Sequence, residues 1–107
     1  MHIVNRNTGE AVNAEAVWKA VRLTCFEGLS VISMILPAGE SVEPHMVEDR
    51  FYLYVVRGCV LFHSEEGSCE LKVGDLAVDE PGSVHGIINQ GKEEALLLLL
   101  RQAPLEE

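Results

Sequence analysis

The sequence predicts an all-β fold built from short strands, arranged as a barrel or a sandwich. Three observations support this prediction. Glycine-containing turn segments recur along the chain, and many of the intervals between them are about 8 to 12 residues long. The apolar runs in these intervals are rich in β-branched, aromatic or leucine residues. Each run is also shorter than a typical buried helix.

The expected strands follow the apolar runs in chain order. The first covers residues 19–26, and the segment before it, from residue 14, also fits helical spacing, so a helical turn there is an alternative. The other expected strands are 29–36, 51–56, 59–63 and 95–100. Apolar and polar residues alternate only weakly in these runs, so we expect several strands to be covered on both faces. The acidic segment 63–70 is expected to be a hairpin loop with a solvated face.

Length and charge limit the class of protein. The chain has 107 residues and is 48% hydrophobic, which suits one domain with its own core. We expect a core at about 20–100, an N-terminal arm at 1–19 and a C-terminal tail at 101–107. The formal net charge of −9 repels phosphate backbones and anionic lipid, so neither nucleic acid nor membrane is an expected partner.

The cysteines and the N-terminus indicate a compartment. The chain has three cysteines, Cys25, Cys59 and Cys69, and no two of them have CxxC spacing. An odd number of cysteines without this spacing predicts free, reduced thiols. The N-terminal segment lacks the features of a signal peptide, and the longest apolar run, at 95–100, is too short to span a bilayer. A cytoplasmic protein is therefore expected.

A spaced set of glycines and one histidine occupies the middle of the chain. Five residues separate Gly39 from His45, and Gly58 closes the segment. The stretch resembles the first motif of the cupin family, which reads G-x5-H-x-H-x3–4-E-x6-G. Both glycines and the first histidine are in register. Val47 and Phe51 stand where the family has its second histidine and its glutamate.

A second spaced set follows, and it resembles the second cupin motif, G-x5-P-x-G-x2-H-x3-N. The residues in register are Gly74, Gly82, His85 and Asn89. The proline is displaced by one, to Pro81, and Glu80 takes its place. Together with the regular spacing of the expected strands, the resemblance covers about residues 20–100. It implies a small single-domain cupin, which is a double-stranded β-helix or jelly-roll barrel.

The resemblance also implies a metal site, of which this chain holds only a part. The family's three histidines and one glutamate suit iron, manganese, nickel, copper or zinc. His45 and His85 keep the first and last positions, and Glu48 or Asp49, from the loop that follows, is the candidate for a third ligand. Two protein ligands make a weak divalent-metal site, so we expect weak metal binding or none. No phosphate loop with a lysine is present, so no nucleotide cofactor is expected.

The mouth of the barrel is the expected ligand pocket. Alternate residues of a strand share a face, so Phe51, Leu53 and Val55 should point inward and make the floor apolar. The expected pocket residues are His45, Val47, Phe51, Leu53 and His85. Three states of the two histidines stay open. They hydrogen-bond to each other or to water without metal, they bind a metal with a carboxylate or water, or they hold or protonate a ligand without metal.

Two functions follow from these alternatives. The first is a binding protein that holds a small, partly apolar molecule in the barrel mouth with an incomplete metal site. The second is a metal-dependent enzyme of the dioxygenase or isomerase type that the resemblance implies, using His45, His85 and a nearby carboxylate or water. Whether the protein is an enzyme is left open, and no catalytic residue is assigned.

A homodimer is expected, because the chain is short and single-domain cupins commonly pair. His63 has the opposite strand parity from Val60 and Phe62 and is expected at the surface.

Overall fold

The structure is a computed structural model that describes residues 1–13 and 16–104. These residues form ten strands, and no helix is found among them. The strands are β1 (Glu10–Val12), β2 (Lys19–Phe26), β3 (Leu29–Leu36), β4 (Ser41–Val47), β5 (Arg50–Arg57), β6 (Cys59–Ser64), β7 (Gly67–Lys72), β8 (Leu76–Asp79), β9 (Ser83–Ile88) and β10 (Ala95–Gln102). The prediction of an all-β fold is confirmed. The helical turn considered before β2 falls partly on residues 14–15, which lie outside the described residues, and residues 16–18 form bends.

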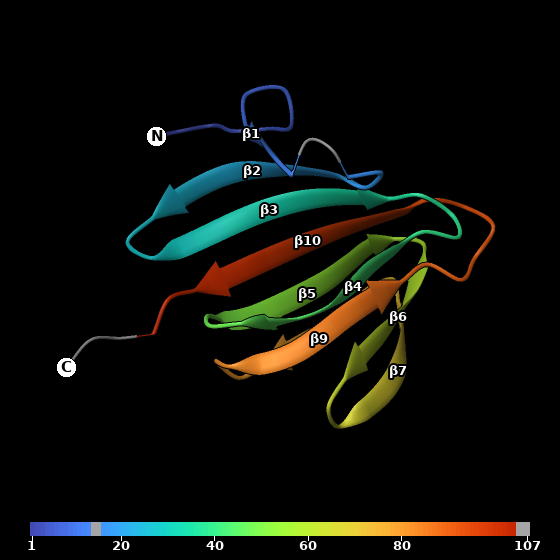
Figure 1. The fold of residues 1–107 in the computed structure, drawn as a ribbon. Helices are drawn as coiled ribbons and strands as arrows, with labels where there is room; N and C mark the ends of the chain where they lie inside the picture. The colour runs from blue at the N-terminus through green and yellow to red at the C-terminus, as the bar shows by residue number, and fades with distance from the viewer. Residues whose placement is uncertain (14–15, 105–107) are drawn as a thin grey trace.

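The strands form two antiparallel sheets packed as layers (Figure 1). The first sheet has six strands in the order β1-β2-β3-β10-β5-β8, and the second has four in the order β4-β9-β6-β7. The last strand, β10, therefore lies in the middle of the larger sheet, between β3 and β5 (Figure 1). The core lies between the two sheets, since the buried apolar cluster takes residues from both.

Strand parity explains which side chains reach this core. Phe51, Leu53 and Val55 of β5 are 4%, 0% and 0% exposed, which confirms their expected shared inward face. On β6, Val60 and Phe62 are buried. His63 is exposed, as predicted from its opposite parity, and its Nδ1 lies 2.6 Å from the Ser68 hydroxyl.

The outer face of the six-stranded sheet corrects one expectation. On β10 the inward leucine Leu97 is fully buried, but the outward Leu98 and Leu100 are only half-buried. They line a shallow apolar groove with Tyr52 and Tyr54. The expectation that such strands are covered on both faces is wrong for β10 in the single chain, because a two-layer sandwich buries one face of each sheet. The homodimer stays a prediction, which light scattering can check.

The acidic hairpin is tighter than expected. Pairing of β6 with β7 continues to Ser64 opposite Gly67, so only Glu65 and Glu66 form the turn. The expectation of a loop over 63–70 is wrong because the strand pairing extends through most of that segment. Most side chains of β7 are exposed all the same, so the face is solvated.

Both ends of the chain add to the larger sheet. Within the N-terminal arm, β1 pairs with β2, and the Arg6 guanidinium donates hydrogen bonds to the carbonyl oxygens of Ser33 and Lys19 at 2.7 and 3.2 Å. In the expected tail, β10 continues to Gln102. The sheet therefore extends past the expected core at both ends. The described part of the chain contains no helix able to cross a membrane.

Candidate functional site

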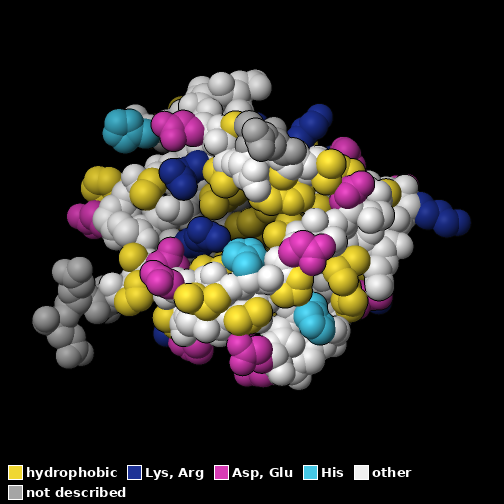
Figure 2. All heavy atoms as spheres, in the orientation of Figure 1, with side chains coloured by type: hydrophobic (Ala, Val, Ile, Leu, Met, Phe, Trp, Pro, Cys, Tyr) yellow, Lys and Arg dark blue, Asp and Glu magenta, His cyan; other side chains and the backbone are white. Residues whose placement is uncertain are grey.

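A cavity of about 490 Å³ opens between the two sheets at the mouth of the barrel. Figure 2 shows a hollow with a hydrophobic floor and with basic and histidine side chains at its rim. The apolar wall includes Trp18, Ile32, Met34, Phe51, Ile87 and Leu99. Its size falls in the range of small-molecule pockets, about 300 to 1,000 Å³. A mostly apolar wall with a few polar groups is the usual composition of such pockets.

Two histidines face each other across neighbouring strands of the smaller sheet. His45 on β4 is the register partner of His85 on β9, and their ring centroids are 5.8 Å apart. The pairing of β4 with β9 is irregular between Val42 and His45. This segment contains Pro44, which has no N–H to give to the ladder. The irregularity accompanies the exposure of His45 at the rim, whereas His85 lies deep in the wall.

His85 is held in one orientation. Its side chain is 2% exposed, and its Nδ1 lies 3.2 Å from Oδ2 of Asp79 on β8. Because a carboxylate only accepts hydrogen bonds, Nδ1 carries the proton and Nε2 presents a lone pair. Nε2 is buried and has no hydrogen-bond partner among the described residues. Phe51 tilts against the ring at a centroid distance of 4.1 Å and fixes its place.

Burial keeps His85 neutral. Removal of the ring from water lowers the pKa of His85 below its ordinary value of 6.5. The hydrogen bond and charge of Asp79 oppose this shift, and the charges of His45 and Arg101 add to it. The balance favours the neutral imidazole near pH 7. A neutral ring with a free Nε2 can accept a hydrogen bond, accept a proton or donate to a metal ion.

This pKa shift predicts a pH dependence of stability. The folded state holds His85 neutral, whereas the unfolded state binds a proton near the ordinary pKa of 6.5. Acidification from pH 7 through 6.5 and down through the folded pKa should therefore lower the free energy of unfolding, by at most about 1.4 kcal/mol per pH unit for this one group. We expect His85→Gln to remove that part of the slope in urea titrations between pH 7 and 5.

The matched control for the pH experiment is His63→Gln. His63 is an exposed imidazole on β6, outside the cavity wall. This variant should keep the slope of the wild type. An unchanged slope in His85→Gln would contradict the assignment of the shift to His85.

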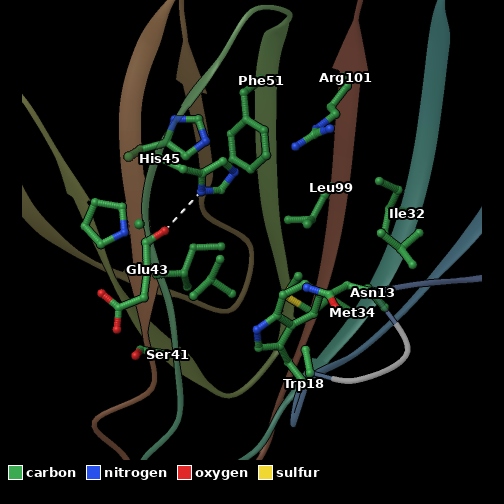
Figure 3. Close-up of a pocket in the computed structure, with 18 of the residues that line it drawn as sticks. Asn13, Trp18, Ile32, Met34, Ser41, Glu43, His45, Phe51, Leu99 and Arg101 are labelled. Carbon is green, nitrogen blue, oxygen red and sulfur yellow. Dashed lines mark hydrogen bonds between the residues drawn. The ribbon is translucent and has the colours of Figure 1, made fainter.

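His45 presents a similar nitrogen at the rim. Its Nδ1 lies 3.0 Å from the backbone carbonyl oxygen of Glu43 (Figure 3). Since a carbonyl only accepts, the proton of this hydrogen bond is on Nδ1, and Nε2 is the ring nitrogen that points away from the backbone contact. His45 is exposed, so water can reach it.

The structure brings together some of the expected pocket residues and not others. His45, Phe51 and His85 line the cavity. Leu53 is fully buried in the core, and Val47 is 5% exposed, but neither reaches the cavity wall.

The expected third metal ligand lies elsewhere. Glu48 and Asp49 follow β4 in the turn before β5, and neither lines the cavity. Within residues 1–13 and 16–104, no group of three or more histidine, cysteine, aspartate or glutamate side chains is arranged to hold a metal ion. The side chain of Phe51 occupies the space beside His85. The described residues therefore do not fit a first-row metal centre that needs three or four protein ligands.

Sequence reasoning missed three polar residues of the site: Asp79, Arg22 and Arg101. Asp79 lies opposite Phe51 in the pairing of β5 with β8, which places it behind His85. Arg101 lies two residues beyond Leu99 on the same face of β10. Strand parity could have found Arg101 if the strand had been extended past residue 100.

Comparisons with known proteins identify the family. The family model described as a cupin domain matches residues 32–101. A comparison with curated proteins gives no match.

Solved structures share the fold. An RmlC-like cupin from Shewanella frigidimarina is 18% identical with a TM-score of 0.83, and the match covers 99% of this chain and 94% of that one. A predicted oxalate decarboxylase from Thermotoga maritima is 23% identical with a TM-score of 0.82, covering 96% and 100%. KdgF from a Halomonas species is 17% identical with a TM-score of 0.78, covering 97% and 96%.

At these identities the likeness shows the fold and not the activity. It confirms the jelly-roll barrel expected from the two motifs. The cupin-domain match covers well over half of the sequence, and the chain therefore belongs to the cupin family.

Proposed function

We propose that the protein binds a small, partly apolar molecule in the cavity between the sheets, and that Nε2 of His85 accepts a hydrogen bond from it. The unpartnered, buried Nε2 is the single observation that carries this proposal. A buried acceptor without a partner is destabilising by about 1 to 3 kcal/mol. A ligand with an O–H or N–H donor relieves that penalty once the side chains that cover this atom move aside, since Nε2 has less than 1 Å² of accessible surface.

The cavity wall supports a partly apolar ligand. Phe51 and Leu99 stand at the same end of the cavity as the two histidines, and Trp18, Ile32 and Met34 continue the apolar wall (Figure 3). Burial of an apolar group against these side chains stabilises the complex by about 25 cal/mol per Å². The polar groups at the rim then fix its orientation.

A metal-dependent enzyme is the alternative function. It would use His45 and His85 with further ligands that the described residues do not bring to the cavity. Elemental mass spectrometry of purified protein separates the two functions. About one first-row metal ion per chain, lost in both His45→Ala and His85→Ala, would favour the enzyme.

The binding function is tested by blocking the cavity. Val42 lines the cavity and is only partly buried, so Val42→Trp should fill the space with little change to the core. Benzyl alcohol is a suitable neutral probe, because it has an apolar ring and one O–H donor. We expect it to shift the amide resonances of His85 and Phe51 in NMR titrations of the wild type and not of Val42→Trp.

The matched control is Val78→Trp. Val78 is half-exposed on β8 and lies outside the cavity wall. This variant should bind the probe as the wild type does. Absence of any shift in the wild type, or equal shifts in the blocked variant, would contradict the proposed function.

A further inference from the structure

Two arginine side chains line the cavity, and neither has a counter-ion among residues 1–13 and 16–104. The structure gives Arg50 an ion pair with Glu80 and Arg57 one with Glu94, while Arg6 donates to backbone carbonyls. Arg22 and Arg101 make no ion pair and no side-chain hydrogen bond with the described residues, and both line the cavity. The Nε of Arg22 is also buried without a partner there.

The strand register places both arginines on one wall. Arg22 of β2 lies opposite Ile32 of β3, and Ile32 lies opposite Leu99 of β10, so the three residues form a row across the sheet. The row spans about 10 Å between its ends. Arg101 lies two residues past Leu99, about 7 Å further along β10. It stands opposite Phe51, beside the histidines (Figure 3).

Among the described residues, the cavity wall holds two arginines and one acidic side chain. Glu43 is the one described acidic residue in the cavity wall, and it lies across the cavity from Arg101 (Figure 3). Arg101 is close enough to lower the pKa of His85. Positive charge in an apolar hollow interacts with an anion more strongly than it would in water. The net charge of −9 over the whole protein opposes the approach of an anion, so the attraction must come from the arginines of the cavity themselves.

The chemistry of the wall defines the anion. Guanidinium groups bind carboxylates and phosphates through paired N–H donors in one plane, and the single arginine beside the histidines suits the singly charged carboxylate. At the same end of the cavity, Nε2 of His85 requires a donor. The apolar wall between the arginines requires a hydrocarbon part.

We infer that the cavity takes a small carboxylic acid, with its carboxylate at Arg101, an O–H or N–H donor at Nε2 of His85, and an apolar group against Leu99 and Ile32. This inference rests on the proposed binding function and names the chemical class of its ligand. A different group of the cavity wall matches each part of such a molecule: an arginine the carboxylate, a histidine nitrogen the donor, and apolar side chains the hydrocarbon.

The test compares a hydroxy acid with its neutral amide. Both enantiomers of mandelate carry a carboxylate, a hydroxyl and a phenyl ring, and mandelamide has a neutral carboxamide of similar shape in place of the carboxylate. We expect NMR titration of the wild type to show tighter binding of a mandelate enantiomer than of mandelamide. Arg101→Gln should weaken mandelate binding by roughly tenfold to a hundredfold and leave mandelamide unchanged.

Two variants control for folding and for general charge. Arg57→Gln removes an exposed arginine that pairs with Glu94 outside the cavity, and it should leave the preference for mandelate intact. Arg101→Lys keeps the charge but not the paired donors, and it should retain part of the preference. Thermal melts confirm that each variant is folded.

The outcomes separate this inference from the proposed function. If mandelate and mandelamide bind equally, or if benzyl alcohol binds and neither of them does, the carboxylate assignment is overturned while the binding function stands. Tighter binding of benzyl phosphate than of mandelate would also overturn the carboxylate assignment. If none of these probes binds, the proposed function fails as well.

Discussion

Replacing Leu97 with alanine is expected to lower the free energy of unfolding by about 2 to 5 kcal/mol. Leu97 is fully buried at the centre of the larger sheet, between Met34 on β3 and Val55 on β5. Truncation removes its apolar contacts and leaves a void that close-packed neighbours fill only in part. Urea denaturation with an unchanged m-value would measure the loss.

The neighbouring residue provides the control. Leu98 lies on the same strand, but it points to the half-exposed outer face. Leu98→Ala removes the same atoms and should cost only about 1 kcal/mol. Equal losses for the two variants would contradict the assignment of Leu97 to the core and Leu98 to the surface.

Replacing Gly86 with alanine is expected to damage both stability and binding. A Cβ at Gly86 would lie 2.9 Å from the nitrogen of Pro44 and 2.9 Å from the carbonyl oxygen of Val42. These are backbone atoms of β4, so relief requires a shift of the strand itself. Overpacking of this kind typically costs about 1 to 3 kcal/mol, which lowers the melting temperature of a domain of this size by roughly 4 to 20 °C.

The binding effect follows from position. Gly86 directly follows His85, and the strand that would move carries His45. We expect Gly86→Ala to abolish the probe shifts at His85 even at temperatures where the variant is fully folded. The control is Gly91→Ala, where the nearest atom to a new Cβ is the side-chain oxygen of Asn89 at 3.2 Å. If the two variants behave alike in scanning calorimetry and NMR titration, the close approach of β9 to β4 is not the cause.

The sequence predicted the long, apolar strands well. The expected strands 19–26 and 29–36 coincide with β2 and β3, and the expected 95–100 lies within β10. Their apolar, β-branched composition is set by the core that they form. Five strands were not predicted: β1, β4, β7, β8 and β9. Most side chains of the first four are exposed, so no apolar run marks them. In β9 the buried residues are interrupted by Gly86 and preceded by a turn, which hid the strand.

The candidate site was less predictable than the fold. The family spacing picked out His45 and His85, and strand parity placed Phe51 beside them. Parity gives the face on which a side chain lies but not its depth along the barrel axis, so Leu53 was expected at the cavity although it lies in the core. Asp79 and Arg22 reach the site through strand pairing between distant segments, which no local pattern encodes.

The central place of β10 governs when the larger sheet and its cavity can be completed during synthesis. β3 and β5 are joined only through this strand, which is the last of the ten along the chain. During synthesis at the ribosome, the earlier strands emerge without their common neighbour. Such non-local pairing makes folding slow. A wall of the cavity is missing until Leu99 and Arg101 arrive, so the cavity is complete only after β10 has left the ribosome and paired.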